Sequence, residues 1–150
     1  NAGVVGSAEA LCGKSHIERL ARRAYQRENI SARGVISAAR KGDPIAAEVM
    51  AEIGRSVGHL LAILSPVFFP QRIVITGGTA EAGEGFFHAI RSRYDELIGA
   101  YMASLGGLTT GTPRPVEIVK GRLGPDAAIL GTVAGFFPGE EPEPRPESSG

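Results

Sequence analysis

Residues 72–80 contain a short β-branched run that leads into two adjacent glycines, and this run constrains the fold more than any other segment. Arg72 begins it, Ile-Val-Ile-Thr follows at 73–76, and Gly77 and Gly78 come next. Isoleucine and valine favour a buried strand, whereas a glycine pair removes two side chains, so the backbone can turn tightly or pass close to a ligand. Such a pair is more often a plain turn than a ligand site. The run predicts a strand, a turn and a helix, as in α/β proteins.

Composition limits the class of protein. The chain has 150 residues, of which 43% are hydrophobic and 21% charged, and this is typical of one globular domain. Lys plus Arg equals Asp plus Glu at 16 each, so charge does not favour nucleic acid or an anionic membrane. A single cysteine excludes an intramolecular disulfide, and the apolar stretch at 60–69 is too short to span a bilayer. We therefore expect a cytoplasmic protein without a signal peptide, whose partner is a small ligand or another protein.

The first half of the chain is predicted to be helical. Apolar residues recur at helical spacing over 17–26, and a second helix is expected over 31–40, where Lys41-Gly42 ends it. Asp43 is a typical N-cap and Pro44 a typical first residue for the next helix. That helix is expected to end at Ser65, because Pro66 disfavours helical geometry in the residue before it.

The second half is predicted to alternate helix and strand. A helix is expected to start within 82–85, with an apolar stripe of Phe86, Ile90, Leu97 and Tyr101. Gly, Thr and Pro at 106–115 predict a loop, and a second strand is expected at 116–119. Gly-Pro-Asp at 124–126 is expected to open a last helix through residue 134. Residues 137–150 are rich in Pro, Glu, Ser and Gly, and we expect them to be disordered.

The order of four segments resembles the C-terminal half of the ROK family, which contains bacterial sugar kinases and sugar-responsive transcriptional repressors. These segments are GDP at 42–44, LSP at 64–66, PQRIVITGG at 70–78 and RLGPDAAILG at 122–131. The resemblance implies a helix-rich α/β fold, the C-terminal lobe of an actin-like ATPase (ribonuclease H-like) fold. On this interpretation the lobe covers residues 1–136.

The resemblance also implies ligand positions. The family contacts the adenosine side of a nucleotide at the place of Gly77, Gly78 and Thr79, where missing side chains leave room and helix N–H groups face polar atoms. Its sugar-binding glutamate corresponds to Glu18, for which the alternative is an ordinary carboxylate that complements a helix dipole. The family's zinc motif contains several cysteines, whereas this stretch has only Cys12, so we expect no zinc and assign no metal-ligating residues.

Three functions remain open at this point. The first is the C-terminal lobe of a sugar kinase, which is glucokinase-like, binds nucleotide, sugar or both, and uses ATP and Mg²⁺. The second is the effector-sensing and dimerisation domain of a repressor that reaches DNA only through an upstream domain. The third is an interaction module without a ligand. No aspartate base or phosphate-binding glycine loop is recognisable, so we expect any catalytic residues to lie in a missing N-terminal lobe, and whether the chain is an enzyme stays open. The resemblance further implies a homodimer.

Overall fold

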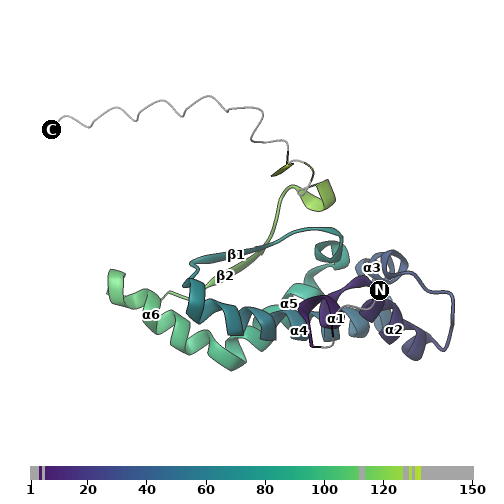
Figure 1. Ribbon diagram of the computed structural model, residues 1–150, viewed down its shortest axis with the longest axis horizontal. Helices are drawn as coiled ribbons and strands as arrows, with labels where there is room; N and C mark the ends of the chain where they lie inside the picture. The colour runs from purple at the N-terminus through teal and green to yellow at the C-terminus, as the bar shows by residue number, and fades with distance from the viewer. Residues whose placement is uncertain (1–3, 5, 112–113, 127–128, 130, 133–150) are drawn as a thin grey trace.

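The computed structural model describes residues 4, 6–111, 114–126, 129 and 131–132. Its longer helices are α1 (Ala8–Cys12), α2 (Lys14–Tyr25), α3 (Ala32–Arg40), α4 (Pro44–Phe68), α5 (Glu84–Tyr94) and α6 (Ala100–Thr110). The strands are β1 (Arg72–Ile75) and β2 (Glu117–Lys120). Short helical turns complete the list: the 3₁₀ turns η1 (Gly78–Ala82) and η3 (Gly124–Asp126) and the π-helix η2 (Asp95–Gly99). The strand pair runs along one side of α5, with α6 at one end of the molecule and α2 and α3 at the other (Figure 1). The helix-rich α/β class is confirmed.

The predicted starts of α3 and α4 are confirmed within one residue, and both helices have an N-cap, of which only Asp43 was predicted. Ser31 Oγ accepts a hydrogen bond from the Gly34 N–H at 3.1 Å, and Asp43 Oδ1 accepts one from the Ala46 N–H at 2.8 Å. These bonds satisfy N–H groups that have no partner within the first helical turn. Gly42 separates the two helices with a φ of +89°, a conformation that glycine adopts readily.

The predicted end of α4 at Ser65 was wrong, because the helix continues through Pro66 to Phe68. The Phe69 N–H closes the helix by donating to the Ser65 carbonyl at 2.8 Å. Ser65 itself is buried, and its Oγ accepts a hydrogen bond from the Tyr94 hydroxyl at 3.1 Å. This contact with a distant residue holds Ser65 in the helix, and it outweighs the local preference of a residue before proline.

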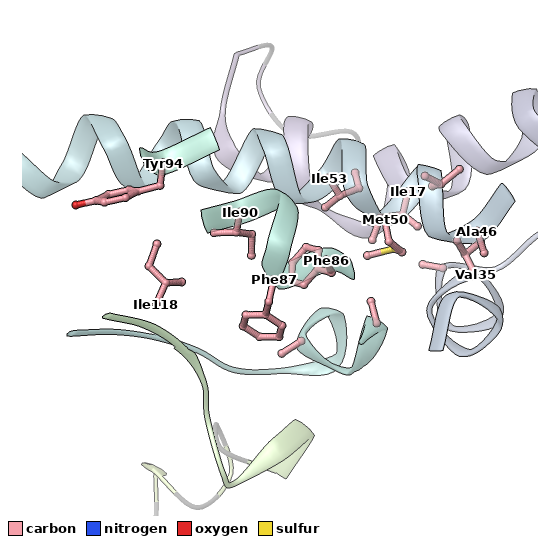
Figure 2. Close-up of a cluster of buried hydrophobic side chains, with 14 of the residues drawn as sticks. Ile17, Val35, Ala46, Met50, Ile53, Phe86, Phe87, Ile90, Tyr94 and Ile118 are labelled. Carbon is pink, nitrogen blue, oxygen red and sulfur yellow. The ribbon is translucent and has the colours of Figure 1, made fainter. Parts of the chain in front are cut away.

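The core lies mainly between α4 and α5, which pack closely because α4 carries Gly54 and Gly58. A Cβ added at Gly54 would lie 2.7 Å from the Phe86 carbonyl oxygen, and one added at Gly58 would lie 2.5 Å from that of Ile90. Both distances are shorter than a real side chain tolerates. Figure 2 shows the apolar side chains of this core, among them Ile53 and Met50 of α4 and Phe86, Phe87, Ile90 and Tyr94 of α5.

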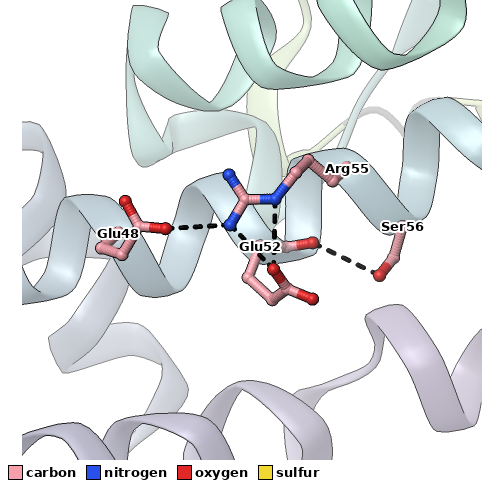
Figure 3. Close-up of polar contacts among 4 residues, drawn as sticks. All are labelled: Glu48, Glu52, Arg55 and Ser56. Carbon is pink, nitrogen blue, oxygen red and sulfur yellow. Dashed lines mark hydrogen bonds and ion pairs between the residues drawn. The ribbon is translucent and has the colours of Figure 1, made fainter.

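The opposite face of α4 is polar. The Arg55 guanidinium contacts Glu48 at 2.9 Å and Glu52 at 2.8 Å, and the Ser56 hydroxyl donates to the Glu52 carbonyl at 3.3 Å (Figure 3). The hydrogen bond that Arg55 donates to Glu48, followed by those it donates to Glu52, raises the pKa of Arg55 above its ordinary value. Exposed ion pairs of this kind contribute little stability, so burial of the opposite face determines the position of α4.

β1 and β2 form a parallel pair in which Arg72 lies opposite Glu117 and Ile75 opposite Lys120. The second strand is shifted by one residue from the predicted 116–119. β1 was predicted to be buried, and this was wrong for one of its faces. Ile73 and Ile75 are partly buried against the core, whereas the Val74 side chain on the other face is 53% exposed. In the described part of the chain, helices cover only one face of this sheet.

The helix after the glycines begins within the predicted 82–85, but its apolar stripe breaks at η2. Leu97 and Tyr101 were expected in the core and are 42% and 55% exposed, whereas Met102 is 3% exposed. A π-helix adds about one residue to a turn and therefore rotates all later side chains around the helix axis. The loop predicted at 106–115 was also partly wrong, because α6 continues to Thr110. Gly106 instead allows the returning chain to approach, since its Cβ would lie 3.1 Å from the Arg114 carbonyl oxygen.

The predicted last helix begins where expected, with η3 at Gly124–Asp126. Much of the remainder of that helix, and all of the predicted tail at 137–150, lie outside the described residues. In the described part of the chain, no helix is both long enough and apolar enough to cross a membrane.

Candidate functional site

The two adjacent glycines differ in what their backbone requires. Gly77 has a φ of +88° and a ψ of −177°, a region that only glycine adopts readily. Gly78 has no such constraint, and a Cβ added there would have no other atom within 4 Å. The glycines were predicted to lead directly into the long helix. They lead instead into the five-residue turn η1, because Gly83 separates η1 from α5. Gly77 is therefore explained by its turn, whereas the open space beside Gly78 is available to a ligand.

That open space belongs to a cavity of about 800 Å³ between η1, α3 and the junction of α1 with α2. From η1 it is lined by Gly78, Thr79 and Glu81, and from α3 by Ala32, Arg33, Ile36, Ser37 and Arg40. The α1–α2 junction contributes Ala8, Glu9, Cys12, Gly13, Lys14 and Ile17. Its volume is within the range of small-molecule sites in proteins, which is about 300–1,000 Å³.

The α3 face of this cavity was not recognised from the sequence. Arg33, Ser37 and Arg40 follow one another at intervals of four and three residues, so they share one side of a helix. This spacing was the available signal, but it does not reveal which side of α3 faces η1.

Positive charge exceeds negative charge around the cavity. Arg33 and Arg40 make no ion pair among the described residues, whereas Glu81 is neutralised by Lys120, whose Nζ lies 2.7 Å from its carboxylate. Lys14 adds a cation that is only loosely paired, 3.9 Å from Glu18. Unpaired arginines attract anionic groups such as phosphate.

Cys12 lies at the wall of the cavity and is half-buried. Burial raises the pKa of its thiol above the ordinary value, and the nearby Glu9 carboxylate raises it further. The thiol is therefore protonated at neutral pH and is a poor nucleophile. No three His, Cys, Asp or Glu side chains gather as metal ligands among the described residues.

Glu18 does not line this cavity, unlike Gly78 and Thr79. Its carboxylate Oε1 accepts a hydrogen bond from the Ala32 N–H at 3.2 Å, and Oε2 lies 3.8 Å from Arg22. Its side chain is only 16% exposed. Glu18 thus joins α2 to the N-terminus of α3, where a carboxylate complements the free N–H groups and the helix dipole. Gly77 is likewise absent from the cavity wall, although it immediately precedes Gly78.

Comparison with known proteins identifies relatives. A family model described as ROK family matches residues 2–134. The DNA-binding transcriptional dual regulator NagC of Escherichia coli (strain K12) is 34% identical over 98 residues, which is 60% of this chain and 24% of the regulator. The glucokinase of Thermotoga maritima is 27% identical over 147 residues, covering 89% of this chain and 43% of the kinase.

A similar fold is found in the crystal structure of a ROK family glucokinase from Streptomyces griseus in complex with glucose and AMPPNP. The TM-score is 0.69 at 25% identity, over 88% of this chain and 45% of that one. The chain spans less than half the length of each of these three relatives.

Proposed function

The chain belongs to the ROK family, and on that premise we propose that it forms the C-terminal lobe of an actin-like ATPase fold and supplies the nucleotide-binding side of a sugar kinase. One observation carries this proposal: Gly78 and Thr79, which the sequence predicted to contact nucleotide, line a cavity of about 800 Å³. The similar glucokinase from Streptomyces griseus holds glucose and AMPPNP, so a protein of this fold has room for both ligands.

The chemistry of the cavity supports a nucleotide. Ile17, Ala32 and Ile36 offer apolar surface for a base, and Thr79 offers a hydroxyl. Arg33 and Arg40 supply positive charge for phosphate oxygens. The absence of a side chain at Gly78 lets the ligand approach the backbone closely.

The phosphoryl-transfer chemistry would come from outside this chain. A kinase needs an aspartate base and Mg²⁺ on the ATP phosphates. On this proposal ATP arrives as its magnesium complex, and a second lobe supplies the base. A sugar contact by Glu18 stays a prediction, and it requires Glu18 to release the Ala32 N–H or to bind sugar through its other carboxylate oxygen.

A second function is favoured by one specific observation. The regulator NagC is 34% identical to this chain, whereas the Thermotoga glucokinase is 27% identical. On this alternative the cavity binds an effector sugar, and an upstream domain contacts DNA.

Binding of AMPPNP to the wild type and to Gly78→Val tests the first function. The Cβ of a valine at Gly78 would have no other atom within 4 Å, and its two methyl groups would take up cavity space. We therefore expect at least about a tenfold loss of affinity, or about 1.4 kcal/mol. Gly85→Val is the matched control. A Cβ added at Gly85 would likewise have no other atom within 4 Å, but Gly85 lies on α5 outside the cavity. Calorimetry of both variants, with circular dichroism to confirm folding, measures the difference. Equal affinities for the two variants would contradict nucleotide binding at Gly78.

The two functions are separated by assaying a longer polypeptide that contains this chain and the rest of a ROK protein. Sugar-dependent ATP hydrolysis is expected of a kinase. Sugar binding without hydrolysis, together with a helix-turn-helix domain upstream, is expected of a repressor.

A further inference from the structure

The cavity has two arginines on one side, and neither is neutralised by an acidic side chain. Arg33 and Arg40 line it from α3, both are exposed, and neither makes an ion pair in the part of the chain that the structure describes. They are seven residues apart, so they lie on the same side of the helix, about 10.5 Å apart along its axis. Two cations at this spacing fit a ligand that carries two separated negative charges.

The carboxylates of the cavity wall lie on other elements and do not cancel this charge. Glu81 of η1 already pairs with Lys120 at 2.7 Å, and Glu9 belongs to α1. Lys14 adds a third cation to the wall, because its Nζ is only loosely paired, 3.9 Å from the Glu18 carboxylate. The α3 side is therefore the positive side of the cavity.

Residues 138–150 of the same chain carry the opposite charge, with four glutamates against one arginine. Prolines at 142, 144 and 146 fix φ and favour extended backbone in the residue before each of them, so the sequence favours a polyproline II helix. That helix has three residues per turn and rises about 3.1 Å per residue. Glu140 and Glu143 would therefore share one side of it, about 9 Å apart. This spacing is close to that of the two arginines.

The chain leads to this segment from beside the cavity. η3 packs against η1, and a Cβ added at Gly124 would lie 3.8 Å from the carboxylate of Glu81, which lines the cavity. Glu140 is 14 residues beyond Asp126, the last residue of η3. Fourteen extended residues cover about 46 Å, and eight helical residues followed by six extended ones still cover about 30 Å. The chain is thus long enough to return to the cavity.

We propose that residues 138–147 bind in the cavity of their own chain, where the carboxylates of Glu140 and Glu143 pair with the two arginines. The proline rings contact the apolar part of the wall, which includes Ile17 and Ile36. A segment stiffened by proline loses little conformational entropy when it binds. Tethering gives it an effective concentration on the order of 1 mM, so a contact with a dissociation constant of about 0.5 mM fills the cavity about two thirds of the time.

The consequence for ligand binding rests on the proposed function. Nucleotide phosphates and the carboxylates of this segment need the same guanidinium groups, so a nucleotide binds only when the segment has left the cavity. If the cavity is free about one third of the time, the apparent affinity for nucleotide falls about threefold. The C-terminal segment is then an inhibitor built into the chain.

NMR spectroscopy of the full chain tests the contact without any nucleotide. Glu140→Gln/Glu143→Gln removes two charges from one side of the polyproline II helix. Glu141→Gln/Glu147→Gln is the matched control, because it removes two charges from another side. We expect the first variant to shift the amide resonances of α3 and η1 at the cavity, and the control to leave them as in the wild type.

Equal shifts for both variants, or no shift for either, would overturn the proposal. Shifts that grow with chain concentration would also overturn it, because the segment would then be binding to a second molecule. Circular dichroism checks that both variants keep the helix content of the wild type, as expected for substitutions outside the described helices.

Calorimetry with AMPPNP tests the competition. Glu140→Gln/Glu143→Gln is expected to bind AMPPNP about threefold more tightly than the wild type, and the control variant with wild-type affinity. Equal affinities for all three proteins would overturn the competition. Failure of all three to bind AMPPNP would instead contradict the proposed function, while the NMR shifts would still decide whether the segment occupies the cavity.

Discussion

Two pairs of glycines in this chain have opposite surroundings. Gly54 and Gly58 lie where α4 crosses α5, and a Cβ at either position would collide with a backbone carbonyl oxygen at 2.7 or 2.5 Å. Gly77 and Gly78 lie in a turn, and a Cβ at either would have no other atom within 4 Å. The first pair lacks side chains because the core leaves no room for them. Gly77 is required by its backbone, so only Gly78 is free to serve a ligand.

The largest effect is expected from Gly58→Ala. Its new methyl group must displace the backbone of α5, since it would lie 2.5 Å from the Ile90 carbonyl oxygen and 3.0 Å from the Arg93 Cβ. We expect this to cost about 3 kcal/mol of unfolding free energy, as overpacking of a rigid core does, and urea denaturation measures it. Gly85→Ala, on the exposed side of α5, is the control and is expected to stabilise the protein by about 0.5–1 kcal/mol. Equal stabilities for these two variants would mean that α4 and α5 do not cross this closely.

Gly77→Ala is expected to have the next largest effect. Its φ of +88° and ψ of −177° are strained for any residue with a side chain, so alanine should cost about 2 kcal/mol. Gly78→Ala, one residue later, meets neither a contact nor a strained φ and should change stability by about 0.5 kcal/mol or less. Thermal unfolding of the two variants measures the difference. Equal stabilities for Gly77→Ala and Gly78→Ala would contradict the conclusion that only Gly77 is required by its backbone conformation.

Tyr94→Phe is expected to cost about 1 kcal/mol. It removes the hydroxyl that donates to Ser65 Oγ at 3.1 Å at the far end of the α4–α5 contact, where both side chains are buried. The double variant Tyr94→Phe/Ser65→Ala is expected to be less destabilised than the sum of the two single variants, because no partner is left without a hydrogen bond. Simple additivity in denaturation experiments would indicate that this bond does not hold the end of α4.

The smallest effect concerns a partly buried polar contact and appears as a dependence on pH. The hydrogen bond from the Tyr25 hydroxyl, followed by that from the Ala46 N–H, holds the pKa of Asp43 below its ordinary value. The folded state therefore favours the ionised carboxylate. Its stabilising effect is complete above the unfolded pKa of about 4 and is lost as the pH falls through the lower folded pKa.

Melting temperatures of the wild type and of Asp43→Asn, measured from about pH 7 to about pH 2.5, check this sign. The difference between the two proteins is expected to shrink as the pH falls. A difference that grows with acidity would show that Asp43 does not favour its ionised form in the folded protein.

Local signals predicted the elements of the fold, and distant contacts decided where several of them end. The cap at Asp43 and the break at Gly42 were predicted correctly, because each acts on its own helical turn. The continuation of α4 past Pro66 depends on Tyr94, which is 29 residues beyond Ser65. The exposure of Leu97 and Tyr101 depends on the π-helix at Asp95–Gly99, for which no pattern in the sequence was recognised.

The candidate site divides in the same way. The family resemblance marked Gly78 and Thr79, and it rests partly on a local pattern, a strand that leads into two glycines. The opposite wall, with Arg33 and Arg40, belongs to a helix more than thirty residues earlier in the chain. The same distinction separates Glu18 from the cavity, because its partner, the N–H of Ala32, comes from a neighbouring helix.

The sequence by itself therefore determined the starts of α3, α4 and α5, the two strands to within a residue, the turn at Gly77 and the resemblance to a family. These features depend on residues close together in the chain. Only the tertiary structure decided which face of the sheet stays open and which side of α3 meets η1. The physical reason is that backbone conformation and capping are local, whereas burial and hydrogen-bond partners depend on where distant segments come to rest.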